Sequence, residues 1–279
     1  MTLAVTIVHA CRRAGRGGSP TAVVDEASLT DAERRAVPVA AGTSHAVFLG
    51  TGSDGAVSLR FFTAAGELPA CGHGTVAALA VLADRADTRA YETVLRSGDR
   101  TFLGRATRSA GCYEATFDPG PVELRSPTPT ERAAVLSALG IRADAPCRVA
   151  SVGRPRLLVQ VPDRAALAEL VPDLTRLREA CERLGLLGCY VFSTPDGDGR
   201  AAARMFAPSI GVPEDIANAN STACLAAHLA EHRGSALAVD MGDALGQPST
   251  VIATARTGRN GTLVRVGGTA GITGRLALG

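Results

Sequence analysis

The stretch "LRFFTAAGELPACGHGTVAALAVL", residues 59–82, decides the fold because it joins a strand, a turn and a helix of unusual composition. Its first residues are apolar and aromatic, as in a strand, and the turn that follows contains Gly and Pro. The segment from Thr75 onward is apolar on nearly every face, and a helix without a polar face belongs inside a protein. The stretch predicts a strand that leads into a buried helix, with Cys71 and His73 between glycines at the helix start.

A second stretch, "RMFAPSIGVPEDIANANSTACLAAHL" at residues 204–229, has the same order of parts. Without gaps, Arg60 falls on Arg204, and Cys71 falls on Asp215. The two stretches therefore predict an internal duplication. Many further short β-like runs are bounded by Gly, Pro, Asp or Asn, so the expected class is α+β, with two pseudo-symmetric domains. Each is expected to be a mostly antiparallel, barrel-like sheet wrapped around a central helix.

The Pro-rich segment "FDPGPVELRSPTPT", residues 117–130, lies between the two stretches. Such a segment is typical of a domain boundary. It predicts an N-terminal domain over residues 1–120 and a C-terminal domain over residues 121–279. The last strand is free in this scheme to pack back onto the N-terminal domain.

Composition excludes several classes of function. All 29 basic residues are Arg, so neither a Schiff-base lysine for pyridoxal phosphate or aldolase chemistry nor a phosphate-loop lysine is available. With a net charge of +2, no Trp and no basic stripe, nucleic acid is not an expected partner. No apolar run reaches the ~18 residues of a membrane span. The N-terminal apolar run precedes its arginines, unlike a secretory signal, which predicts a cytoplasmic protein.

Cysteine and histidine spacings give no sign of a metal centre. The seven cysteines contain no C-x-x-C pair, and the histidines contain no H-E-x-x-H motif. His228 and His232 lie one turn apart but are expected near a helix end, where a cation suits the helix dipole. We therefore expect no disulfide framework and no bound metal.

The predicted duplication suggests chemistry. If the halves are symmetric, Cys71 and Asp215 would face each other across a cleft between domains, each just before a buried helix. Helix N-termini carry N–H groups without intrahelical partners and bind carboxylates. The same field favours a thiolate. Two proton-transfer groups beside a held carboxylate are what proton abstraction and return at carbon require.

These stretches, together with "GGSPTAVV" (17–24), "LGQPS" (245–249) and "VRVGGTAGITG" (264–274), resemble the phenazine-biosynthesis (PhzF-like) isomerase family. That family shares its fold with diaminopimelate epimerase and proline racemase. The resemblance implies a diaminopimelate epimerase-like fold, a cleft active site, no cofactor or metal, and a homodimer. It assigns catalytic roles to Asp215 and His73.

The sequence departs from the family pattern at two places. The family's acid/base Glu falls in "GTSHAVFL" (42–49), where Ser44 stands, and a hydroxyl cannot replace a carboxylate as a proton carrier at neutral pH. His45 beside it is either an alternative base or an outward strand residue. In the loop after Asp215, Asn220 stands where the family has Ser.

The expected function is a cofactor-independent isomerase that moves a proton and a double bond in a small amino- or imino-acid-like carboxylate. Such a substrate belongs to specialised metabolism, as in antibiotic biosynthesis. Asp215 and His73 are the expected proton carriers, while Cys71 is either a third catalytic group or a buried small residue in a turn. Further residues are expected to contact the substrate: Ser44, His45, Gly72, Gly74, Asn218, Asn220 and Ser221. Two alternatives remain, a Cys71-dependent racemase or epimerase and a non-catalytic carboxylate-binding relative.

Overall fold

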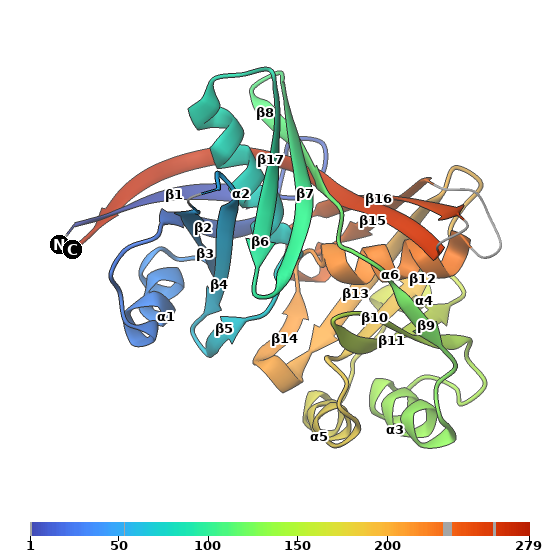
Figure 1. The fold of residues 1–279 in the computed structure, drawn as a ribbon. Coiled ribbons are helices and arrows are strands. Elements are labelled where there is room, and N and C mark those ends of the chain that lie inside the picture. The colour runs from blue at the N-terminus through green and yellow to red at the C-terminus, as the bar shows by residue number, and fades with distance from the viewer. Residues whose placement is uncertain (1, 53, 231–235, 259–260) are drawn as a thin grey trace. The chain divides into compact units, whose positions relative to one another are not determined.

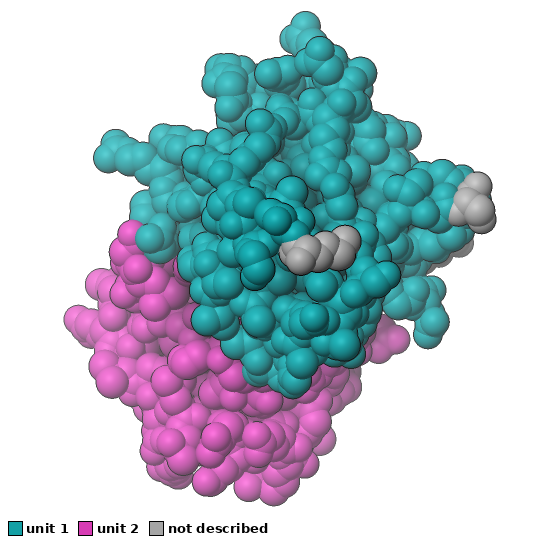
Figure 2. Space-filling view, turned by 90° about the vertical axis from the view of Figure 1, so that its left-hand side faces the viewer, with its two compact units in different colours: residues 1–118, 247–250, 266–279 teal, residues 119–246, 251–265 magenta. Residues whose placement is uncertain are grey.

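A computed structural model describes residues 2–52, 54–230, 236–258 and 261–279. Contacts between residues divide the chain into two compact units, distinguished by colour in Figure 2. Unit 1 comprises residues 1–118, 247–250 and 266–279, and unit 2 comprises residues 119–246 and 251–265. The assignment of residues 1–120 and 121–279 as domains stays a prediction.

Within the described residues of unit 1, eight strands form a closed barrel. Each strand hydrogen-bonds to the next, and the last one returns to the first. Only the pairs β2–β3 and β4–β6 are parallel, so the barrel is mostly antiparallel. In ring order the strands are β1 (Leu3–Ala10), β2 (Ser19–Asp25), β3 (His45–Thr51), β4 (Val57–Thr63), β6 (Ala90–Ser97), β7 (Arg100–Ser109), β8 (Cys112–Phe117) and β17 (Gly261–Leu278).

Helix α2 (Gly72–Ala86) fills this barrel, as Figure 1 shows. It contacts β1, β2, β3, β6, β7 and β8, and its residues 72–81 are all buried. Small side chains let the strands pass close to the helix. At Gly104 on β7, for example, a Cβ would lie 2.7 Å from methyl groups of Leu79 and Leu95. The predicted buried helix and the sheet around it are confirmed.

The other elements of unit 1 lie outside the ring. Helix α1 (Asp31–Ala40) follows β2 and begins with the capping box of Thr30 and Glu33. It packs on β2, β3 and β4. The short strand β5 (Gly66–Leu68) pairs with β4 and leads into α2.

Unit 2 contains a second mixed sheet. The neighbours in order are β9 (Glu123–Arg125), β10 (Cys147–Val152), β11 (Arg154–Val161), β12 (Cys189–Ser193), β13 (Arg200–Ala207) and β15 (Ala236–Met241). Pairs β11–β12 and β13–β15 are parallel, and the other three are antiparallel. Strand β14 (Val212–Asp215) pairs with β13. Strand β16 (Ser249–Gly258) and the 3-10 turn η2 (Asp243–Leu245) follow β15.

Helices cover both faces of the sheet in unit 2. Helix α6 (Ala219–Ala230) contacts β10 and β15 and is buried along most of its length. The other side carries α3 (Pro129–Leu139), α4 (Arg164–Ala168) and α5 (Leu174–Leu184). Their apolar side chains form a core with the sheet, including Leu136, Leu167, Leu177, Val159 and Phe206.

The carboxylate of Glu131 stabilises the start of α3 and gives a pH-dependent contribution. It completes a capping box with Thr128 and accepts two hydrogen bonds from Arg125, at 2.5 and 2.8 Å. The Arg125 contact lowers the pKa of Glu131 to about 2. Because the folded pKa lies below the unfolded one, this stabilisation is present above about pH 4.5 and is lost as the pH falls towards 2.

Replacing Glu131 by Gln should therefore lower the free energy of unfolding at pH 7 by about 1.5–3 kcal/mol, as expected for a hydrogen bond to a charged group. Urea denaturation of both proteins at pH 7 and at pH 2.5 measures this, and the difference should shrink at the lower pH. Glu33→Gln in the exposed capping box of α1 is the matched control and should change stability less. An equal difference at both pH values would contradict the assignment.

The two units repeat one topology. In unit 1 the order β1, β2, β3, β4, β5, α2, β6 has parallel pairs β2–β3 and β4–β6. In unit 2 the order β10, β11, β12, β13, β14, α6, β15 has parallel pairs at the same places, β11–β12 and β13–β15. In both, the arginine on the fourth strand lies over a phenylalanine ring two residues later, Arg60 over Phe62 and Arg204 over Phe206.

The ungapped register of the repeat is wrong after these residues. On β4, Phe61 pairs with Leu68, whereas the matching Met205 on β13 pairs with Asp215. Asp215 therefore corresponds to Leu68 and not to Cys71. The reason is a longer connection in unit 2, where the 3-10 turn η1 (Pro208–Ile210) lies between β13 and β14.

The helix starts fix the corrected register. The N–H and the hydroxyl of Thr75 both donate to the Cys71 carbonyl at 2.9 Å. In the same way the N–H and the hydroxyl of Thr222 donate to the Asn218 carbonyl at 3.0 Å. The counterpart of Cys71 is thus Asn218.

Candidate active site

Three buried side chains gather at the start of α2. The Cys71 thiol Sγ lies 3.3 Å from Nε2 of His73. The His45 ring, from the first residue of β3, meets the His73 ring edge-on, with centroids 4.3 Å apart. Their relative exposures are only 5%, 3% and 4% for Cys71, His73 and His45. The Cys71 thiol and the His73 imidazole are thus in contact and can exchange a proton.

The local sequence explains this arrangement. Cys71 is the extended N-cap of α2, and its side chain makes no capping hydrogen bond. Gly74 makes room for the thiol, since a Cβ there would lie 3.1 Å from Sγ and 3.0 Å from the Phe61 ring. The glycines predicted as substrate contacts, Gly72 and Gly74, are both buried in the first turn.

His45 points inward, so its interpretation as an outward strand residue is wrong. Burial, followed by the neighbouring His73, holds the pKa of His45 well below its usual range, which keeps the imidazole neutral at pH 7. Its Nδ1 lies 2.9 Å from the hydroxyl of Ser44. Ser44 itself is exposed. The serine that stands at the place of the family's acid/base Glu therefore lies at the surface and contacts the buried His45 ring.

A different set of groups stands at the start of α6. Asp215 ends β14 and is 8% exposed. The side-chain amide of Asn218 donates to Asp215 Oδ2 at 2.9 Å, and its oxygen accepts the N–H of Ser221 at 2.9 Å. Asn218 therefore caps the helix and orients the carboxylate at once. Asn220, half-buried in the first turn, occupies the place that His73 has in unit 1.

Arg156 on β11 is a member of this second cluster that the sequence analysis missed. It is 2% exposed, and its guanidinium donates to the hydroxyl of Ser221 at 3.1 Å and to the carbonyl of Arg154 at 2.6 Å. The sequence gives only a weak signal, because Arg156 stands directly before the apolar residues of "RPRLLVQV" (154–161), where a charged residue at a strand start is ordinary. Buried arginines are rare unless they are paired or serve an anion.

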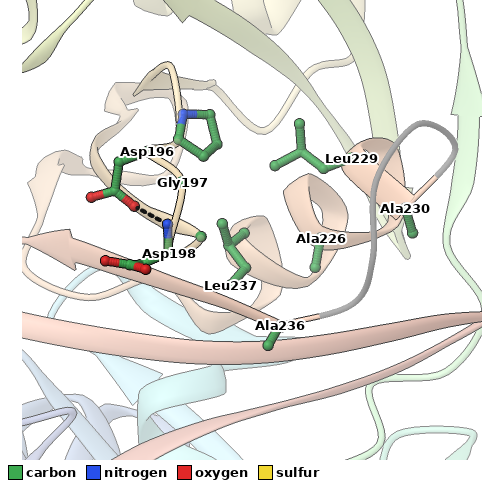
Figure 3. A pocket seen from close by; sticks show the side chains of 10 residues that line it. Asp196, Gly197, Asp198, Ala226, Leu229, Ala230, Ala236 and Leu237 are labelled. Atoms are coloured by element: carbon green, nitrogen blue, oxygen red, sulfur yellow. Dashed lines mark hydrogen bonds between the residues drawn. The ribbon is translucent and has the colours of Figure 1, made fainter.

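A cavity of about 430 Å³ in unit 2 contains none of these residues in its described lining (Figure 3). Its polar groups come from the turn around Asp196, and its apolar ones include Ala226, Leu229 and Leu237. The Asp196 carboxylate is used by that turn, since it accepts the N–H groups of Asp198 and Arg200 at 3.0 and 2.8 Å. The cavity does not suggest acid/base chemistry.

Potential metal ligands occur together in one place in the part of the chain that the structure describes. Donor atoms of His45, Cys71 and His73 all lie within 4.8 Å of one another. His228 lies in the last turn of α6, as expected, while His232 is outside the described residues. The spacing of the histidines in the sequence did not predict that His45, Cys71 and His73 lie together.

The family follows from comparison with known proteins. The family model described as "Phenazine biosynthesis-like protein" matches residues 11–274. The chain belongs to this family. It is 30% identical to a trans-2,3-dihydro-3-hydroxyanthranilate isomerase of Pseudomonas chlororaphis, covering 93% of this chain and 92% of the relative. An uncharacterized isomerase of Salmonella typhimurium is 29% identical over 86% of this chain and 85% of its own.

Solved structures agree with this membership. A predicted epimerase from Pseudomonas aeruginosa superposes with a TM-score of 0.83 at 28% identity, covering 99% of both chains. A hydroxyproline epimerase from Agrobacterium vitis shares the fold alone, with a TM-score of 0.70 at 11% identity, covering 99% of this chain and 92% of the other. The PhzF-like chain is therefore an isomerase-type enzyme with the epimerase fold. No helix within the described residues is long and apolar enough to cross a membrane.

Proposed function

We propose that the chain is a cofactor-independent isomerase that moves a proton, and with it a double bond, within a small amino- or imino-acid-like carboxylate. The observation that carries the proposal is that each buried helix begins beside buried proton-transfer groups. These are Cys71 and His73 at α2, and Asp215 at α6. A helix N-terminus also binds the substrate carboxylate.

Asp215 and His73 carry out the two proton transfers of this reaction. The side-chain amide of Asn218 donates to Asp215 Oδ2 and holds the carboxylate in a fixed orientation, and this carboxylate is the base that takes a proton from carbon. The electron pair left on carbon shifts the double bond along the conjugated substrate. His73 then gives a proton to the far carbon and takes one from the Cys71 thiol, whose Sγ lies 3.3 Å from Nε2. Loss of the proton from Asp215 to water, and uptake of one from water by Cys71, restore the enzyme. Substrate and product differ only in the position of one hydrogen and one double bond.

A two-thiol racemase would need a second cysteine at the position that matches Cys71, and the chain has none there. The counterpart of Cys71 is Asn218, because both begin a buried helix and both accept from a threonine one turn later. Cys224 lies inside α6 and is fully buried, and this burial raises its pKa. A thiol of that kind stays protonated at neutral pH and therefore does not act as the base.

The function can be tested by proton exchange. We expect incubation in D₂O with trans-2,3-dihydro-3-hydroxyanthranilate, or with an unsaturated cyclic imino acid, to shift the double bond and place one deuterium on carbon. Proton NMR follows both changes. Inversion at Cα that disappears in Cys71→Ala would instead support a racemase. Binding without exchange of any carbon-bound hydrogen would contradict both reactions and leave a carboxylate-binding protein.

A further inference from the structure

Three side chains at the start of α2 are of the kind that binds transition metals. They are His45, Cys71 and His73, here named the His-Cys-His cluster. The cluster brings a thiol and two imidazoles together, all at least nine-tenths buried, with donor atoms within 4.8 Å of one another. Thiolate and imidazole are the ligands that zinc takes in proteins, whereas magnesium and calcium take oxygen. We propose that the His-Cys-His cluster binds one Zn²⁺ ion.

The distances suit the ion. With zinc about 2.3 Å from sulfur and about 2.0–2.1 Å from nitrogen, tetrahedral ligand atoms lie about 3.5 Å apart. The Cys71 Sγ to His73 Nε2 distance is 3.3 Å, close to that value. The widest spacing in the cluster, within 4.8 Å, needs to close by little more than about 1 Å, which side-chain rotation supplies.

Ser44 orients the third ligand. Its hydroxyl lies 2.9 Å from Nδ1 of His45, so Nε2 is the nitrogen left for a metal. Hydrogen bonds of this type fix the ring and the tautomer of metal-binding histidines. This gives the serine at the family's glutamate position a role that does not require it to carry a proton.

The charge and the number of the ligands in the cluster also suit Zn²⁺. The thiolate of Cys71 offsets one of the two charges of zinc, which matters because the N-terminus of α2 is itself positive. Three protein ligands leave the fourth position of the ion for water or another exchangeable ligand. Binding would occupy the Cys71 sulfur and a His73 nitrogen, so zinc should also inhibit the proposed isomerase. The binding itself does not depend on that function.

Cobalt(II) is the probe for this site, because a thiolate bound to cobalt gives a charge-transfer band in the near ultraviolet. The full chain is freed of metal with a chelator and titrated with CoCl₂, and the band should saturate at one cobalt per chain. Added ZnCl₂ should abolish it, since zinc binds such sites more tightly than cobalt. No band at any ratio up to one cobalt per chain would overturn the proposal.

Variants assign the ligands. Cys71→Ser should remove the band, and His45→Gln should weaken cobalt binding at least 10-fold. Cys112→Ser, which changes a half-buried cysteine of β8, is the matched control and should keep both band and affinity. A band that persists in Cys71→Ser would overturn the proposal. If that variant fails to fold, mass spectrometry of the wild-type chain decides, because zinc should slow alkylation of Cys71 by iodoacetamide but not that of Cys112. Equal rates with and without zinc would overturn the proposal.

Discussion

Asp215→Asn should lower turnover of the isomerase by about 10²–10⁴, the usual contribution of a positioned acid or base. The amide keeps the shape of the carboxylate but cannot take a proton from carbon at neutral pH. Asn218 donates to the carboxylate at 2.9 Å, so the side chain that loses its function is one that the structure holds in a fixed orientation. Deuterium incorporation, measured by NMR in the assay described above, gives the rate.

The control for this variant is Asp198→Asn, which changes an exposed carboxylate of the same unit. It should leave the rate of exchange unchanged. Circular dichroism of both variants establishes that each is folded before the rates are compared. A rate for Asp215→Asn within about threefold of the wild type, far less than the loss of an acid or base causes, would remove Asp215 from the mechanism.

Gly267→Ala should produce the largest loss of stability, because this residue lies where the barrel closes. Strand β17 pairs with β8 there, with Gly267 opposite Thr116. A Cβ on Gly267 would overlap the Ala115 carbonyl oxygen, a backbone atom that cannot move aside without breaking the strand pair. We expect a loss of about 3 kcal/mol or more, at the upper end of what overpacking costs.

The same strand supplies a matched control. Gly274 pairs with Ile7 at the far end of β17, and a Cβ there meets no atom within 4 Å. Gly274→Ala should therefore change the midpoint of urea denaturation very little. Equal midpoints for the two variants would show that the close approach of β17 to β8 does not limit stability.

The sequence pattern predicted those parts of the fold whose burial follows from the composition of a single segment. Helix α2 has apolar or small residues on every face, so its position inside a sheet followed from composition. The capping boxes at Thr30 and Thr128 were equally local and are present. The class of the fold and the duplication followed from two such helices.

The register of the repeat and the composition of the site depend on information that no single segment contains. The longer β13–β14 connection shifts Asp215 by three positions, and a 3-10 turn leaves no periodicity that would reveal it. His45 and Cys71 meet because β3 and the start of α2 are adjacent in the barrel, although they are far apart in sequence. Arg156 reaches Ser221 across 65 positions of the chain.

The extra turn η1 has a consequence for the chemical groups that each half of the chain carries. In the ungapped match of the two stretches, Asp215 would stand at the position of Cys71. With the turn in place, β14 has a carboxylate where β5 has Leu68, while the start of α2 carries a thiol and an imidazole in contact. The length of one connection thus accounts for different reactive groups in two copies of the same topology.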